Sequence, residues 1–69
     1  MTELKKQFGN RLKQLRKRRC ITQEQLADLA DLSVESISNI ERGVFAPKFE
    51  NLEKLALVLN VDVKTLFDF

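Results

Sequence analysis

Apolar residues recur at helical spacing along most of the 69-residue chain, and they predict five short helices. The first is expected over residues 4–18, where apolar side chains fall on one stripe and Lys and Arg occupy most other positions. Gly9 lowers helix propensity by about 1 kcal/mol, so we expect the regular helix to begin near Gln7, and Met1 and Thr2 to fray. The stripe consists of Leu4, Phe8, Leu12 and Leu15.

Two further helices, joined by a tight turn, are expected within residues 22–43. The first covers residues 23–30, and Thr22 can cap it in a capping box with Gln25, three positions later. Ala27 is small, as two helices that cross closely after a short turn require. The apolar positions of this helix are Leu26, Ala27, Leu29 and Ala30.

The second of these helices is expected over residues 33–42. Ser33 is suited to its N-cap, and Gly43 stands where a left-handed C-terminal cap would lie. Ile37 and Ile40 share one face, which we expect to point into the protein. The opposite face then carries Glu35, Ser38, Asn39 and Arg42, with Ser33, Val34 and Ser36 near its edges.

The C-terminal third predicts an amphipathic helix over residues 49–59. We expect Phe45 and Phe49 to fill the core next to Ile40, and Asn60 to provide a left-handed cap. The buried stripe of this helix is expected to comprise Leu52, Leu55, Ala56 and Leu59.

A last short helix is expected over residues 63–67, with Asp62 as its cap. The end of the chain carries more large apolar side chains than so short a helix can bury internally. We therefore expect a two-fold dimer surface, with a hydrophobic lid on the monomer core as the alternative. The candidates for this surface are Val58, Val63, Leu66, Phe67 and Phe69.

Residues 22–43 resemble the helix-turn-helix of the lambda-repressor-like family, of the Cro/CI or XRE type. Counting from Gln23, the ninth residue departs from the family, which usually has Gly where Asp31 stands, although Asp tolerates positive φ better than most residues. The family also often has Gly in place of Cys20, which we expect to be small and partly buried. The positions that agree with the family are Leu26, Ala27, Ala30, Leu32, Ile37 and Ile40.

The flanking segments also follow the family, so the resemblance covers nearly the whole chain. It implies an all-α bundle of five short helices, a single DNA-binding domain over residues 1–69, whose third helix enters the major groove of double-stranded DNA. There, Asn39 can bond an adenine edge, Glu35 a cytosine amino group and Val34 a thymine methyl group. The residues expected to contact bases are Ser33, Val34, Glu35, Ser38 and Asn39.

Phosphate contacts are expected from Gln23 and Lys48, which match the family's phosphate clamps, and from Arg42 at the far end of the reading helix. Gln23 as an ordinary first-turn residue is the alternative. The resemblance also implies an inward ion pair between Arg16 and Glu41 that joins the first helix to the third. A solvent-exposed Arg16 is the alternative to that pair.

Charge is distributed unevenly along the chain, although the net charge is only +2. Residues 1–19 hold eight Lys and Arg against one Glu, whereas the remainder holds four basic and nine acidic residues. Such segregation can focus a positive field on one side of a small domain and favours salt-dependent binding of a polyanion. A Lys-rich helix surface that is merely solvated is the alternative.

Several function classes are disfavoured by what the sequence lacks. The chain has no His and one cysteine, Cys20, which argues against an enzyme and against a zinc or other metal site. A single cysteine cannot form an internal disulfide, which points to a reducing, cytoplasmic setting. No cofactor or small-molecule effector is expected. No apolar run approaches the roughly 18 residues of a membrane span, and no signal peptide is visible, so we expect a cytoplasmic, nucleoid-associated protein without a membrane partner.

The sequence therefore predicts a sequence-specific, double-stranded DNA-binding transcriptional regulator of a bacterium or phage. A homodimer would present two reading helices about 34 Å apart to a pseudo-palindromic operator. A phage repressor, a restriction–modification controller and the partner of a toxin remain open. The alternative is a protein–protein interaction module, such as an antitoxin or adaptor, for which we would expect apolar residues where the outward face of residues 33–42 is mostly polar.

Overall fold

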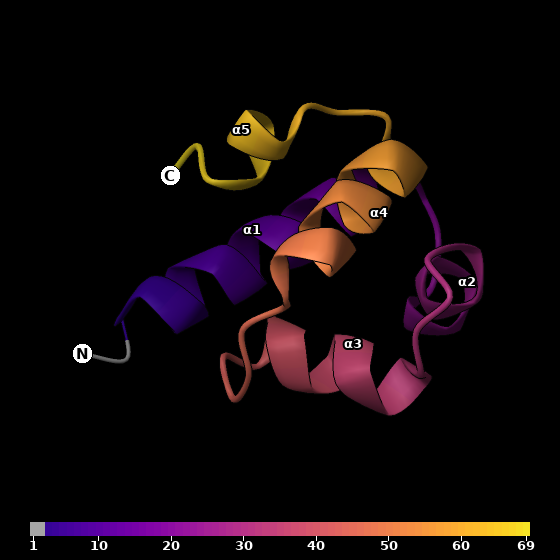
Figure 1. Ribbon diagram of the computed structural model, residues 1–69, viewed down its shortest axis with the longest axis horizontal. Helices are drawn as coiled ribbons and strands as arrows, with labels where there is room; N and C mark the ends of the chain where they lie inside the picture. The colour runs from indigo at the N-terminus through magenta and orange to yellow at the C-terminus, as the bar shows by residue number, and fades with distance from the viewer. Residues whose placement is uncertain (1–2) are drawn as a thin grey trace.

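The computed structural model describes residues 3–69, which form five α-helices and no strand. This confirms the all-α fold predicted from the apolar periodicity and the family resemblance. α3 lies along one edge of the molecule, α5 lies at the opposite edge, and α2 closes one end (Figure 1). The helices are α1 (Glu3–Arg18), α2 (Gln23–Leu29), α3 (Val34–Glu41), α4 (Phe49–Leu59) and α5 (Val63–Leu66).

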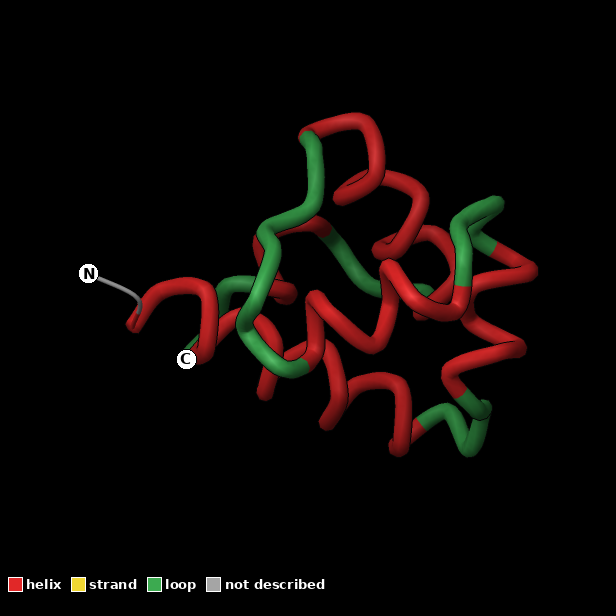
Figure 2. Tube along the Cα trace, turned by 90° about the horizontal axis from the view of Figure 1, so that it is seen from below, coloured by secondary structure: helices red, strands yellow, loops and turns green. Residues whose placement is uncertain are grey.

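One hydrophobic core joins all five helices, within overall extents of 30 × 23 × 22 Å. The first turn of α1 and the C-terminus lie on the same side of the molecule (Figure 2). Burial of the expected stripes of α1, α3 and α4 is confirmed except at the first turn of α1. Within residues 3–69, no helix is both long and apolar enough to cross a membrane. The most deeply buried large side chains are Leu12, Leu26, Ile37, Leu55 and Leu66.

Gly9 proved to have a different role from the one expected. α1 is regular from Glu3, so the prediction that it begins near Gln7 was wrong. A Cβ at Gly9 would lie 2.4 Å from the carbonyl oxygen of Ile40 and 2.7 Å from that of Glu41. Glycine therefore permits the close crossing of α1 and α3, which outweighs its low helix propensity. The fraying expected of Met1 and Thr2 falls outside the described residues.

Three apolar residues expected in the core, and one apolar position of the second helix, lie at the surface. Leu4 is 58% exposed because α1 extends one turn beyond the core, and Leu29 is 64% exposed at the end of α2. Phe45 belongs to the loop after α3 and Phe49 is the first residue of α4, and they are 55% and 87% exposed. The prediction that these two residues fill the core next to Ile40 was wrong, because more than half of each remains open to solvent.

The predicted caps of α2 and α3 are confirmed. Thr22 and Gln25 form a reciprocal capping box, with the side chain of each accepting a hydrogen bond from the backbone N–H of the other. The hydroxyl oxygen of Ser33 accepts from the backbone N–H of Ser36 at 3.0 Å. These contacts satisfy backbone donors that the first turn of each helix leaves unpaired.

Positive φ angles mark the turns that follow α1, α2, α3 and α4. Asp31, Asn60 and Gly43 have φ of 59°, 58° and 78°, which confirms the left-handed positions expected there. Cys20 has φ of 58° and is exposed, so its expected partial burial was wrong. Asp62 occupies the N-cap of α5 in backbone conformation, but its side chain makes no capping bond, which corrects the predicted cap.

Candidate nucleic-acid interface

α3 presents two faces of opposite character. Ile37 is fully buried and Ile40 is 4% exposed, so the inward face lies where the apolar spacing placed it. Val34 and Glu35 are exposed in the first turn, and the other outward residues are exposed or half-buried. Because the core fixes the inward face, the outward side chains are held on a rigid backbone next to solvent. Those outward side chains are Ser33, Val34, Glu35, Ser38, Asn39 and Arg42.

A buried ion pair locks α1 to α3. Arg16 Nε donates to Glu41 Oε2 at 2.6 Å, and Arg16 Nη2 donates to Glu41 Oε1 at 3.0 Å, which is the bidentate geometry that suits guanidinium and carboxylate. The hydrogen bonding of Arg16 to Glu41 raises the pKa of Arg16 above its ordinary value, although burial acts in the opposite direction. Arg16 Nη1 also donates to the carbonyl oxygen of Ile21 at 2.9 Å, so the pair braces the connection into α2.

Gln23 is drawn into the same network. Its Nε2 donates to Glu41 Oε1 at 3.0 Å, so Glu41 is linked to α1 and α2 at once. The side chain is half-buried, and the second N–H of the amide is the donor that a phosphate could still use. The sequence carried no local signal for this contact, because the two residues are 18 positions apart. The phosphate contact of Gln23 therefore remains a prediction.

The far end of α3 holds a contact that the sequence analysis missed. Arg42 Nη2 donates to Asn39 Oδ1, which turns the guanidinium along the helix surface. The spacing of three residues places the two side chains on one face and could have indicated the bond. It couples a residue predicted to contact bases with one predicted to contact phosphate.

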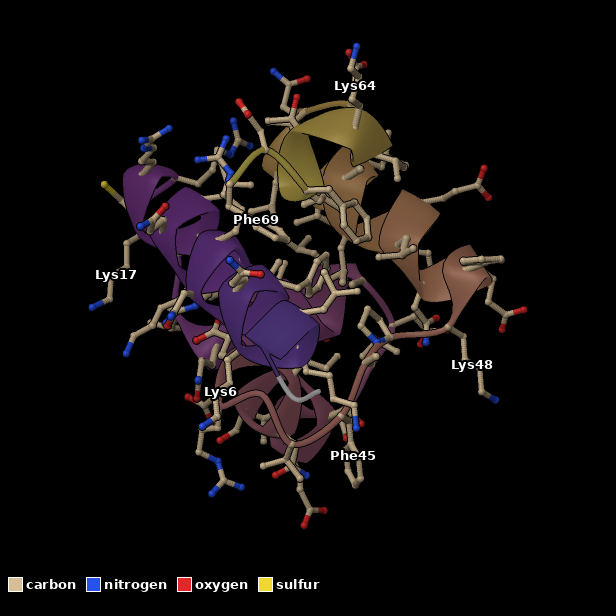
Figure 3. All side chains as sticks on the ribbon, turned by 90° about the vertical axis from the view of Figure 1, so that its left-hand side faces the viewer. Lys6, Lys17, Phe45, Lys48, Lys64 and Phe69 are labelled. Atoms are coloured by element: carbon tan, nitrogen blue, oxygen red, sulfur yellow. The ribbon has the colours of Figure 1, made fainter. Side chains whose placement is uncertain are left out.

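Lys48 stands apart from α3, in the loop that leads to α4. It occupies the N-cap of α4, where its side chain makes no capping hydrogen bond. The side chain is exposed and extends into solvent (Figure 3). This placement leaves its ammonium group able to reach an external phosphate.

The dimer candidates do not form one exposed surface. Leu66 is fully buried in the core of the monomer, so its assignment to a dimer interface was wrong. Phe67 packs on Phe8 with ring centroids 5.0 Å apart, and Phe69 packs on Phe67 at 6.3 Å. A short helix contributes to the core when another element lies over it, and α1 lies over α5. Val58 and Val63 are half-buried against the core.

Two features of the C-terminal region were not foreseen. Arg11 Nε donates to the carbonyl oxygen of Thr65 at 3.0 Å, which ties α5 to α1. Leu57 is 83% exposed on the outer side of α4.

Among residues 3–69, no group of three or more His, Cys, Asp or Glu side chains could hold a metal ion.

Comparison with known proteins agrees with this architecture. The helix-turn-helix family HTH_3 matches residues 12–66. Control protein C.BamHI of Bacillus amyloliquefaciens is 40% identical over 63 residues, which are 90% of this chain and 78% of that protein. The immunity repressor protein of Bacillus phage phi105 is 40% identical over 84% of this chain, which spans only 40% of the repressor's length.

A solved structure gives the same result in three dimensions. The restriction-modification controller protein C.AhdI from Aeromonas hydrophila matches with a TM-score of 0.92 and 33% identity, over 96% of each chain. The family match extends from the middle of α1 to the end of α5, so it includes all of α2, α3, α4 and α5 and the second half of α1. The chain therefore belongs to the helix-turn-helix family HTH_3.

Proposed function

We propose that this DNA-binding helix-turn-helix transcription regulator recognises a specific operator by placing α3 in the major groove of double-stranded DNA. Residues 1–69 would act as a single DNA-binding domain. The observation that carries the proposal is the division of α3 into a packed inward face and an outward face of mostly polar side chains. A protein-interaction module that used this surface would be expected to present apolar groups there.

The proposed base contacts come from the outward face of α3. Val34 and Glu35 are exposed in the first turn, where a recognition helix meets base edges, and Ser33 precedes them at the N-cap. Ser38 and Asn39 lie one turn later and are half-buried. A thymine methyl suits Val34, and an amide suits a base edge that both donates and accepts.

Gln23, Arg42 and Lys48 would contact phosphates on either side of the groove and so set the register of α3. Lys48 allows the cleanest test, because its side chain has no capping role. Lys48→Ala should weaken binding to all duplexes similarly and lower the salt dependence by roughly one ion. An unchanged salt dependence would remove Lys48 from the proposed contacts.

The operator is proposed to be pseudo-palindromic and bound by a homodimer, whose two α3 helices would lie about 34 Å apart. The exposed rings Phe67 and Phe69, with the half-buried Val58 and Val63, remain candidates for the interface, and Leu57 joins them because of its exposure. Sedimentation with and without operator DNA tests this part of the proposal. A strict monomer at high micromolar concentration in both conditions would rule the dimer out.

Selection of binding sites from random duplexes tests the whole proposal. We expect enrichment of one sequence with two-fold symmetry, which would report base recognition and dimeric binding together. Binding that declines steeply with salt but shows no sequence enrichment would contradict sequence-specific recognition. No retention on DNA even in dilute buffer would favour the interaction module. No catalytic activity, cofactor or small-molecule effector is part of the proposal.

A further inference from the structure

We propose that Lys17, at the C-terminal end of α1, is an additional DNA-phosphate contact, seated in a shallow hollow between α1, α2 and the start of α3. Neither the family resemblance nor the helical wheel assigned a DNA contact to α1. The inference rests on the proposed function, because it extends the footprint of the same operator-binding surface onto this helix.

The hollow lies beside residues that are proposed to contact DNA. Its lining includes Lys17 from α1, Gln23 from α2 and Val34 from α3. Val34 is a proposed base contact and Gln23 a proposed phosphate contact, so the hollow adjoins the proposed DNA-binding surface. A duplex that reaches both residues would pass over the hollow. Lys17 stands beside that path.

Among the charged side chains that line the hollow, Lys17 is able to attract a phosphate. Arg16 also lines it, but its guanidinium is buried and already paired with Glu41. Glu24 in the same lining repels a phosphate, so the hollow needs an unpaired cation to receive one. Among the described residues, no carboxylate lies within ion-pair distance of the Lys17 ammonium group, which is therefore able to supply that charge.

The side chain of Lys17 is free to extend toward a phosphate. Lys17 is exposed and extends from the flank of α1 into solvent, whereas Lys64 projects from α5 at the end of the molecule far from α3 (Figure 3). A lysine ammonium on its flexible four-carbon stem can follow a phosphate without a fixed geometry. The neighbouring Arg18 and Arg19 are also exposed and raise the local positive potential.

The experiment compares two charge-matched variants of the full chain, Lys17→Gln and Lys64→Gln, on the selected operator duplex and a random duplex. Dissociation constants are measured across a series of salt concentrations. We expect Lys17→Gln to reduce the slope of log K against log salt by about 0.9, and Lys64→Gln to leave it near the wild-type value. When the salt concentration rises fourfold, the affinity of Lys17→Gln for DNA should therefore fall by a factor roughly three times smaller than that of the wild-type chain. Lys17→Arg should retain the wild-type slope.

A second readout locates the contact. Replacing single phosphates of the operator by neutral methylphosphonates should weaken wild-type binding at the phosphate that Lys17 meets. The same replacement should have little further effect on Lys17→Gln, because the interaction is already lost. Urea unfolding and sedimentation of both variants establish that fold and oligomeric state are retained, as expected for exposed side chains.

The outcomes separate this inference from the proposed function. If Lys17→Gln and Lys64→Gln share one salt slope while Asn39→Ala still loses base discrimination, Lys17 is not a phosphate contact and the proposed function stands. If every phosphate replacement weakens Lys17→Gln as much as wild type, the inference is likewise overturned. If the wild-type chain ignores duplex DNA at low salt, both proposals fail together.

Discussion

The two faces of α3 differ in how far their contacts reach. On the inward face, Glu41 accepts hydrogen bonds from residues 25 and 18 positions earlier in the chain, and two isoleucines lie in the core. On the outward face, the side-chain hydrogen bonds join Ser33 to Ser36 and Arg42 to Asn39, all within three residues. One face ties the helix to the rest of the protein, whereas the side-chain hydrogen bonds of the other, among the described residues, join only near neighbours in the chain.

This difference separates stability from recognition. Side chains with long-range contacts cannot change partners without disturbing several helices, whereas those with local contacts can exchange a neighbour for a DNA group at small cost. Substitutions on the inward face should therefore act on unfolding, and substitutions on the outward face should act on DNA binding.

Removing Glu41 should have the largest effect. Glu41→Ala leaves the charge of Arg16 buried without its counter-ion, and we expect a loss of about 3–5 kcal/mol in the free energy of unfolding. Urea unfolding measures it, with the exposed Glu35→Ala on the other face as the matched control, expected within about 0.5 kcal/mol of wild type. Equal unfolding midpoints for the two variants would show that the pair contributes nothing.

The ionisation of Arg16 determines how the stability contributed by the Arg16–Glu41 pair changes as the pH rises. Glu41 raises the pKa of Arg16, so the folded chain holds that proton more tightly than the unfolded chain. On the alkaline side, the stabilisation is lost only as pH rises through the raised pKa of Arg16. Raising the pH from neutral to mildly alkaline should therefore not weaken this interaction through Arg16.

Adding one methyl group at Gly9 should have the next largest effect. Gly9→Ala improves helix propensity, but its Cβ would clash with the backbone oxygens of Ile40 and Glu41. We expect a net destabilisation of about 1–3 kcal/mol, measured by urea or thermal unfolding. Asn10→Ala, at the exposed neighbouring position, is the control and should stabilise α1 slightly. A stabilised Gly9→Ala would mean that α1 and α3 do not cross so closely.

Asn39→Ala should impair DNA recognition by the outward face of α3 without destabilising the fold. We expect a loss of discrimination of about 1–3 kcal/mol at one or two base pairs, with little change in the urea midpoint. Competition between operator variants measures the discrimination. An equal loss of affinity on operator and random DNA would contradict base recognition by Asn39.

Arg42→Ala should have a smaller effect. Because Arg42 bonds to Asn39, this variant also tests whether the two outward side chains act together on DNA. A phosphate contact predicts a uniform loss on all duplexes and a salt slope lower by about 0.9. The bond to Asn39 adds a small loss of discrimination at the same base pair, so the double variant should lose less than the two single variants together. Full additivity would show that the two side chains act independently on DNA.

Local chemistry explains why most of the secondary structure was predictable. Ser33 and the Thr22–Gln25 pair act within one helical turn, and Asn60 ends α4 by its own backbone conformation. α4 has the predicted bounds, Phe49–Leu59, because a continuous apolar stripe lies between local signals. The outward set on α3 followed from the same periodicity, once two isoleucines defined the inward face.

By itself, then, the sequence determined the five helices, the caps of α2 and α3, the inward face of α3 and the family. Only the tertiary structure decided that Leu66 is core and Phe49 is surface, that Gly9 spaces α1 from α3, and that Gln23 bonds Glu41. Apolar spacing shows which side of a helix is apolar but not whether another element covers it. That depends on how segments far apart in the chain pack, and no local pattern records it.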